Sequence, residues 1–162
     1  MAKNLVKSII LSAVILVITA SYFFGLSIFS FKYADEVSLA SKRYTLPEQL
    51  IRSVILVESG YDEGAVSRAG AEGLMQMMPT TRAWMSEITG ITADRSPKSE
   101  ILLGSAYLRY LLDLTGNLTD ALMAYNAGYT NLQKWKEGGT PFPETLTYVK
   151  RVFFAMNIYR LL

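Results

Sequence analysis

Apolar residues recur every three or four positions along most of the chain, which is the spacing of one face of a helix. The clearest case lies between Pro47, which a first helical turn tolerates, and Gly60, which suits a left-handed helix end. Its apolar stripe consists of Leu50, Ile51, Val54 and Ile55. Glu58 follows on the same stripe, so the sequence predicts a mostly buried carboxylate near the end of this helix.

The same periodicity predicts further helices at residues 80–88, 97–114, 117–128, 131–136 and from 143 to near the C-terminus. Four glycines between residues 60 and 73 indicate a loop with at most a small hairpin. Gly104, inside a predicted helix, indicates the close approach of another backbone. Because strand-like alternation is absent, we expect a mainly α, compact domain over residues 46–162.

The N-terminal segment has a different pattern. From Ser8 to Phe31 there are 24 residues without a charge, and about 20 apolar residues in a helix span a bilayer. Lys3 and Lys7 precede this run, which favours a cytoplasmic N-terminus. We therefore expect one transmembrane helix within residues 1–31.

This arrangement predicts a single-pass protein of the cell inner membrane. Residues 32–45 would be a connector, and the domain that follows would lie on the periplasmic, extracytoplasmic side. A cleaved signal peptide is the alternative, with Thr19-Ala20-Ser21 as a candidate cleavage site, and would leave a secreted or periplasmic protein.

Composition excludes several kinds of chemistry. The chain has no cysteine and no histidine, so disulfides, thiolate chemistry, Ser-His triads and transition-metal catalysis are not expected. The net charge of +2 depends on three lysines around the apolar segment, and the rest of the chain has no basic patch for nucleic acid. Carboxylates, hydroxyls, amides and aromatic rings remain, and we expect no cofactor and no metal.

Four motifs occur in order along the predicted domain. They are Glu58-Ser59, Ser67-Arg-Ala-Gly-Ala-Glu-Gly-Leu-Met-Gln76 with Pro79-Thr80, Ala124-Tyr-Asn-Ala-Gly128, and Pro143-Glu-Thr145 with Tyr148-Val149. Together they resemble the lytic transglycosylase domain of the SLT type, which has a goose-lysozyme-like fold. The resemblance extends from about Leu46 to Tyr159.

The resemblance implies a lyase that cuts the glycan strands of peptidoglycan between N-acetylmuramic acid and N-acetylglucosamine. The muramyl 6-hydroxyl attacks its own anomeric carbon and leaves a 1,6-anhydro end. Glu58 would act first as general acid and then as base. Elementary chemistry agrees, because burial raises the pKa of a carboxyl and an internal nucleophile removes the need for a second carboxylate.

The resemblance also implies substrate-binding roles for Ser67, Met75, Gln76, Tyr125, Asn126, Glu144 and Tyr148. Ser67 would bind the N-acetyl group or position Glu58. Met75 would form an apolar floor for a sugar ring, with ordinary core packing as the alternative. Tyr125 would bring its hydroxyl to Glu58, or be a core residue.

Three of these positions have different alternatives. Gln76 would bind sugar, or satisfy buried polar groups. Asn126 would contact the ligand or brace its helix. Glu144 would hold a muramyl substituent or bind backbone amides as a first-turn acid, and Tyr148 would line the same wall.

Two other functions compete with transglycosylation. A goose-type muramidase would hydrolyse the same bond, with Asp62 or Glu63 activating water. A non-catalytic scaffold would bind the wall within an envelope assembly. The small size and membrane segment resemble transglycosylases that open the wall, so a secretion, pilus or phage-entry machine is a candidate partner.

Overall fold

The computed structural model describes residues 12–17 and 31–162. Residues 12–17 are helical, and the compact unit that contains the predicted domain begins at Phe31. Apart from residues 12–17 and Phe31, the predicted membrane segment lies outside the described residues. Within the two described ranges, no helix has both the length and the apolar character needed to cross a membrane.

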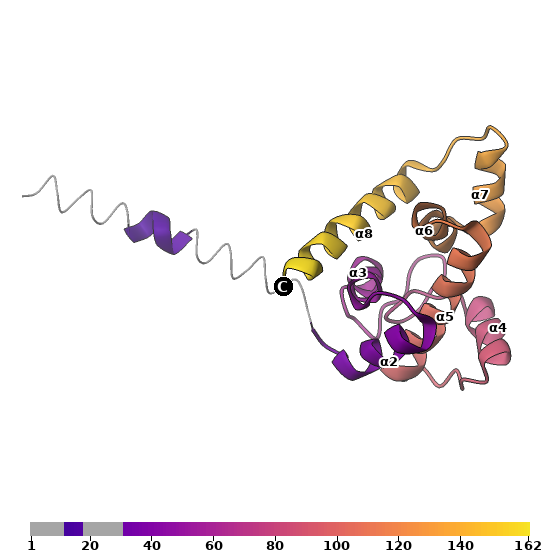
Figure 1. The fold of residues 1–162 in the computed structure, drawn as a ribbon, viewed down its shortest axis with the longest axis horizontal. Helices are drawn as coiled ribbons and strands as arrows, with labels where there is room; N and C mark the ends of the chain where they lie inside the picture. Colours follow the sequence, from indigo (N-terminus) through magenta and orange to yellow (C-terminus); the bar gives the residue numbers. More distant parts are fainter. Residues whose placement is uncertain (1–11, 18–30) are drawn as a thin grey trace, which may run out of the picture. The chain divides into compact units, whose positions relative to one another are not determined.

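Helices make up most of residues 31–162, which confirms the predicted mainly α class (Figure 1). They are α2 (Ala34–Tyr44), α3 (Glu48–Ser59), α4 (Pro79–Thr89), α5 (Pro97–Thr115), α6 (Leu118–Ala127), α7 (Tyr129–Lys136) and α8 (Pro143–Leu161). The loop between α3 and α4 has two isolated antiparallel bridges, Val66 with Glu72 and Glu72 with Met77, in place of the small hairpin.

The helix ends follow from local residue types. Gly60 and Gly116 end α3 and α5 in the left-handed conformation, with φ of 61° and 75°. The Asn117 side chain caps α6 by accepting a hydrogen bond of 2.9 Å from the backbone N–H of Asp120. These ends are confirmed, whereas α7 begins at Tyr129, two residues before the expected start.

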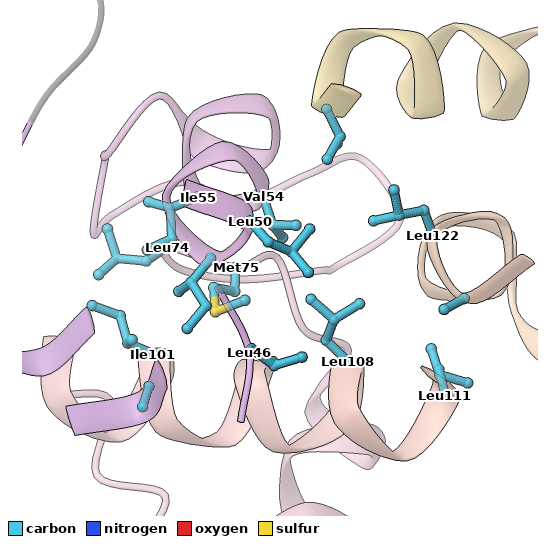
Figure 2. Packing of buried hydrophobic residues seen from close by; sticks show 14 of the residues in the cluster. Leu46, Leu50, Val54, Ile55, Leu74, Met75, Ile101, Leu108, Leu111 and Leu122 are labelled. Atoms are coloured by element: carbon cyan, nitrogen blue, oxygen red, sulfur yellow. The ribbon is translucent and has the colours of Figure 1, made fainter. Parts of the chain in front are cut away.

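The core lies between α3 and α5 and is closed by α6, by α8 and by the loop after α3. The apolar stripe of α3 is fully buried, as predicted. Figure 2 shows Leu50, Val54 and Ile55 of this stripe on the side of α3 that faces α5. Ile101 and Leu108 of α5 lie opposite, and Leu74 and Met75 of the loop lie between the two helices. Burying a side chain of this size contributes about 1.5–3 kcal/mol, so the core fixes the end of α3 against the loop.

The predicted connector, residues 32–45, is part of this unit. Its residues form α2, which packs against α3 and α5. Val37 and Ala40 have no exposed surface. The rest of α2 is largely polar. Because two buried side chains make too weak an apolar stripe, the hydrophobic pattern did not indicate that this helix belongs to the core.

The close approach predicted at Gly104 comes from a side chain and not from a backbone. A Cβ at Gly104 would lie 2.5 Å from Sδ of Met75, so any larger residue would collide with that methionine. Gly104 therefore lets the loop that carries Met75 pack directly on α5.

Candidate active site

A cavity of about 760 Å³ lies at the C-terminal end of α3. Its walls come from the loop between α3 and α4, from the end of α6 and from the first half of α8, with single residues of α4 and α5. Of the predicted site residues, the cavity is lined by Glu58, Ser67, Gln76, Tyr125, Asn126, Glu144 and Tyr148. Segments that are far apart in the sequence therefore meet at one site.

Glu58 occupies the last turn of α3, where it is partly buried and lines the cavity. Burial raises the pKa of this carboxyl to about 7, while Tyr148 and the positive charge of Arg151 act in the opposite direction. The C-terminal end of α3 carries the negative end of the helix dipole, which also disfavours the charged form of the Glu58 carboxyl. Near neutral pH the carboxyl can therefore both donate and accept a proton.

Two tyrosines lie beside Glu58, and Tyr125 fits the alternative of a core residue whose hydroxyl has its own partner. Tyr125 donates a hydrogen bond of 2.8 Å to the carbonyl of Met75, so its hydroxyl braces the loop and is not directed to Glu58. Tyr148 lines the same wall of the cavity as Glu144. Its buried hydroxyl makes no hydrogen bond of normal length within the described ranges, yet it is close enough to lower the pKa of Glu58.

The negative charge of Glu58 affects the pKa of both tyrosines. Burial raises the pKa of Tyr125 and of Tyr148 well above the usual value, and the nearby Glu58 carboxylate raises it further. Both hydroxyls therefore stay protonated, and Tyr148 is a neutral hydroxyl near the Glu58 carboxylate.

The loop that follows α3 presents Gln76 and Ser67 to the cavity. Gln76 has φ of 46°, an uncommon conformation for a residue with a side chain. Its amide donates to the carbonyls of Ala65 and Gly73, at 3.0 and 2.9 Å, which leaves Oε1 as an acceptor. The Ser67 hydroxyl accepts from the Ala71 N–H at 2.9 Å and keeps its own proton for another partner.

Adjacent residues in this loop face opposite ways. The Met75 side chain is 1% exposed, packs on Gly104 and does not line the cavity. The structure thus places it in the core and not as a floor for a sugar ring. Met75 contributes to the site through its backbone carbonyl, which accepts the hydrogen bond from Tyr125. The backbone is left-handed at Gln76, and the side chains of Met75 and Gln76 point in different directions.

A charged cluster holds the loop from behind. The buried Glu100 of α5 accepts a hydrogen bond of 2.8 Å from the Leu74 N–H, and Arg82 of α4 contacts Glu72 at 2.9 Å. Gly73 lies directly against Glu100, since a Cβ there would be 2.1 Å from a carboxylate oxygen.

A second contact joins the loop to the end of α3. Next to Glu58, the Ser59 hydroxyl donates a hydrogen bond of 2.9 Å to the Leu74 carbonyl. The loop is therefore tied both to α5 and to the end of α3.

The first half of α8 forms one wall of the cavity. Glu144, Thr147, Tyr148 and Arg151 line it, at the spacing of one helix face. Asn126 is exposed, and its Oδ1 accepts from the Thr145 hydroxyl at 2.7 Å, which joins α6 to α8. Arg151 was not predicted, although its position seven residues after Glu144 on the same helix was a usable signal.

Tyr107 of α5 was also not predicted as a lining residue. Its ring lies 5.4 Å from the ring of Tyr125. The sequence shows it only as one more aromatic residue of a core helix. Its place at the cavity depends on how α5 crosses α6, which no local pattern encodes.

The acids considered for a hydrolase lie outside the cavity. Asp62 accepts from the Gly64 N–H at 2.8 Å within the loop, and Glu63 accepts a hydrogen bond from Tyr33. Both carboxylates are exposed. The acids that line the cavity are Glu58 and Glu144.

Comparison with known proteins places these features in a family. Residues 36–143 match the family described as the transglycosylase SLT domain. The transglycosylase of Enterobacteria phage PRD1 is 35% identical over 109 residues, which are 67% of this chain and 39% of that protein. The membrane-bound lytic murein transglycosylase C of Edwardsiella ictaluri is 36% identical over 112 residues, which are 60% of this chain and 31% of that protein. The chain thus spans less than half the length of these relatives.

Solved structures agree in fold. An inactive mutant of the lytic transglycosylase Slt from Pseudomonas aeruginosa matches with a TM-score of 0.75 and 30% identity, over 81% of this chain and 24% of that one. A complex of the 70-kDa soluble lytic transglycosylase with bulgecin A matches with a TM-score of 0.76 and 27% identity, over 82% of this chain and 25% of that one. The predicted lysozyme-like fold of the SLT type is confirmed, and the matched region begins inside α2 and not after it.

Proposed function

The chain belongs to the transglycosylase SLT domain family, and from this premise we propose that it cleaves the glycan strands of peptidoglycan by transglycosylation. The observation that carries the proposal is the Glu58 carboxyl, whose pKa of about 7 lies at the operating range of a general acid. It faces a cavity that also holds hydroxyl, amide and guanidinium groups suited to a polar, ring-shaped substrate.

In the first step, protonated Glu58 donates its proton to the glycosidic oxygen that leaves the anomeric carbon of N-acetylmuramic acid. The C–O bond breaks as the proton arrives, and Glu58 becomes a carboxylate. Tyr148 and Arg151 favour this charged form, because both lower the pKa of Glu58. They would stabilise the charge that appears on the enzyme as the bond breaks.

In the second step, the muramyl 6-hydroxyl attacks the anomeric carbon of the same sugar. The Glu58 carboxylate takes the hydroxyl proton and is ready for another cycle. The products are a 1,6-anhydromuramyl end and a free N-acetylglucosamine 4-hydroxyl. One carboxylate is enough, since the nucleophile belongs to the substrate and is held close to the reacting carbon.

The remaining cavity residues are proposed to bind substrate. Oε1 of Gln76 and the proton of Ser67 suit the N-acetyl groups, because each is left over after the contacts within the loop. Asn126 has an exposed side chain at the rim. Glu144 and Arg151 bring opposite charges to the α8 wall, where a muramyl substituent would contact them.

The site of action follows from the substrate and from the N-terminal segment. We propose that residues 1–31 anchor the chain in the inner membrane and that the domain lies in the periplasm. If the segment is cleaved, the domain acts as a free periplasmic or secreted protein. A partner machine for secretion, pilus assembly or phage entry is a further proposal, which rests on the combination of the SLT domain with the N-terminal apolar segment.

Hydrolysis of the same bond is the alternative that the site favours less. A muramidase needs a base for water, and neither Asp62 nor Glu63 lines the cavity. The double variant D62N/E63Q is therefore a matched control. Release of soluble fragments from purified peptidoglycan should be unchanged in this variant and lost in Glu58→Gln. Undiminished release by Glu58→Gln would mean that another group supplies the proton, and no release by the wild type would point to the non-catalytic scaffold.

A further inference from the structure

Two exposed aromatic rings lie next to the cavity but do not line it. Trp84 of α4 is 38% exposed and Tyr110 of α5 is 42% exposed. Their ring centroids are 5.0 Å apart and the ring planes meet at 87°. We refer to Trp84 and Tyr110 as the aromatic pair. Single exposed apolar residues are ordinary, but two large rings in contact with each other form a surface with a defined shape.

The aromatic pair is continuous with the cavity. Tyr107 lines the cavity, and its ring lies 6.3 Å from the ring of Trp84. Thr81 of α4 also lines the cavity, and Trp84 follows it by three residues, as Tyr110 follows Tyr107 on α5. Because residues three apart lie on the same helix face, each helix leads from a cavity residue to an exposed ring one turn away. Figure 1 shows α4 alongside α5, so the two faces adjoin.

The chemistry of the pair matches a carbohydrate better than an apolar partner. An aromatic ring offers an apolar face for the C–H side of a pyranose, and the indole N–H and phenol O–H are polar groups at the ring edges. A glycan strand bound in the cavity is longer than the cavity, so its further sugars must extend outward over the cavity rim. The Trp84–Tyr107 distance is comparable to the length of one such sugar, so the next residue of the strand would reach Trp84.

We propose that Trp84 and Tyr110 form an additional glycan subsite outside the cavity, where a sugar of the same strand stacks on the exposed rings. The inference rests on the proposed function, since it concerns the same substrate. It goes further by assigning a surface that adds affinity for long strands and leaves the cleavage step untouched.

The test separates binding from turnover. In the full chain, kept in mild detergent, Glu58→Gln is combined with Trp84→Ala, and binding to purified insoluble peptidoglycan is measured by sedimentation. We expect about tenfold weaker binding than for Glu58→Gln alone, which corresponds to the loss of one good aromatic contact. Trp84→Phe should restore most of it. Phe154→Ala is the matched control, because Phe154 is 65% exposed on α8 and does not line the cavity.

A second measurement uses the otherwise wild-type enzyme. Trp84→Ala should raise KM about tenfold on long strands while leaving turnover of a fragment that fills only the cavity unchanged. Equal losses on short and long substrates would overturn the inference, because Trp84 would then act only by supporting Tyr107. Unchanged binding to peptidoglycan would also overturn it and would direct attention to a protein partner for this surface. If Glu58→Gln alone fails to bind peptidoglycan, the proposed function falls and the subsite with it.

Discussion

Replacing Glu58 by glutamine is expected to stabilise the folded domain, and to do so more at high pH than at low pH. The pKa of Glu58 is about 7 in the folded chain, whereas its ordinary value is 4.5. Between these values the folded state holds a proton that the unfolded state has lost. The stability of the wild type therefore falls as pH rises from about 4.5 to about 7 and is constant above that.

The size of the effect follows from the difference in pKa. Each pH unit in this interval corresponds to about 1.4 kcal/mol, which gives roughly 3 kcal/mol as an upper limit over the whole interval. Because the carboxyl is only partly buried and faces an open cavity, about 2 kcal/mol is the expected difference. Glutamine has the same shape and no charge, so this loss is absent from the variant.

Thermal and denaturant unfolding, followed by far-UV circular dichroism, would measure this difference. The gap between Glu58→Gln and wild type should be near zero at about pH 4 and about 2 kcal/mol at about pH 8, or roughly 6–8 °C in Tm. Glu137→Gln, in an exposed turn after α7, controls for removal of a surface charge. A gap that does not change with pH would mean that Glu58 is solvated, and the argument for a general acid would lose its physical basis.

Three further changes test the surroundings of Glu58 and the fold. Tyr148→Phe removes a group that lowers the pKa of Glu58. In a plot of kcat/KM against pH, the alkaline limb should therefore move to higher pH, and kcat should fall. An unchanged pH profile would contradict this role of Tyr148. Gly73→Ala places a Cβ against Glu100 at a φ of 77° and should destabilise the domain by about 2 kcal/mol or more in denaturant melts. Asn117→Ala removes the cap of α6 and should cost about 1 kcal/mol without loss of activity, and a loss of activity at full stability would contradict a purely structural role.

Most of the helices were predictable because their signals are local. The Gly60 and Gly116 ends and the Asn117 cap depend on residues within one turn of each helix end. The packing of α2 on the core was not predicted because it contributes only two fully buried side chains, in a polar stretch. The sequence alone could not distinguish that weak stripe from a connector.

The site was predictable in its residues more than in its contacts. The apolar stripe of α3 pointed to Glu58, and the motifs pointed to Ser67, Gln76, Tyr125, Asn126, Glu144 and Tyr148, which also line the cavity. Which hydroxyl lies near Glu58 depends on how α6 and α8 pack on α3, so the sequence could not decide between the two roles considered for Tyr125. The inward position of Met75 depends on the left-handed turn at Gln76, a conformation that no propensity predicts for glutamine.

The charged cluster behind the loop could not be predicted at all. Glu100 and Arg82 are on different helices, and both are buried against the loop that presents Gln76. In the sequence they are isolated charges on predicted helices, which normally face solvent. Only the tertiary arrangement brings them together, and it makes the loop a fixed part of the site.

The central claim is that the substrate's own hydroxyl, and not water, attacks the carbon activated by Glu58. Digestion of purified peptidoglycan in water enriched with ¹⁸O, followed by mass spectrometry of the muramyl ends, tests it most directly. We predict ends that lack one water relative to the hydrolysed form, carry no ¹⁸O, and are absent when Glu58→Gln replaces the wild type. Reducing muramyl ends that carry ¹⁸O would contradict the account and identify a hydrolase on the same fold.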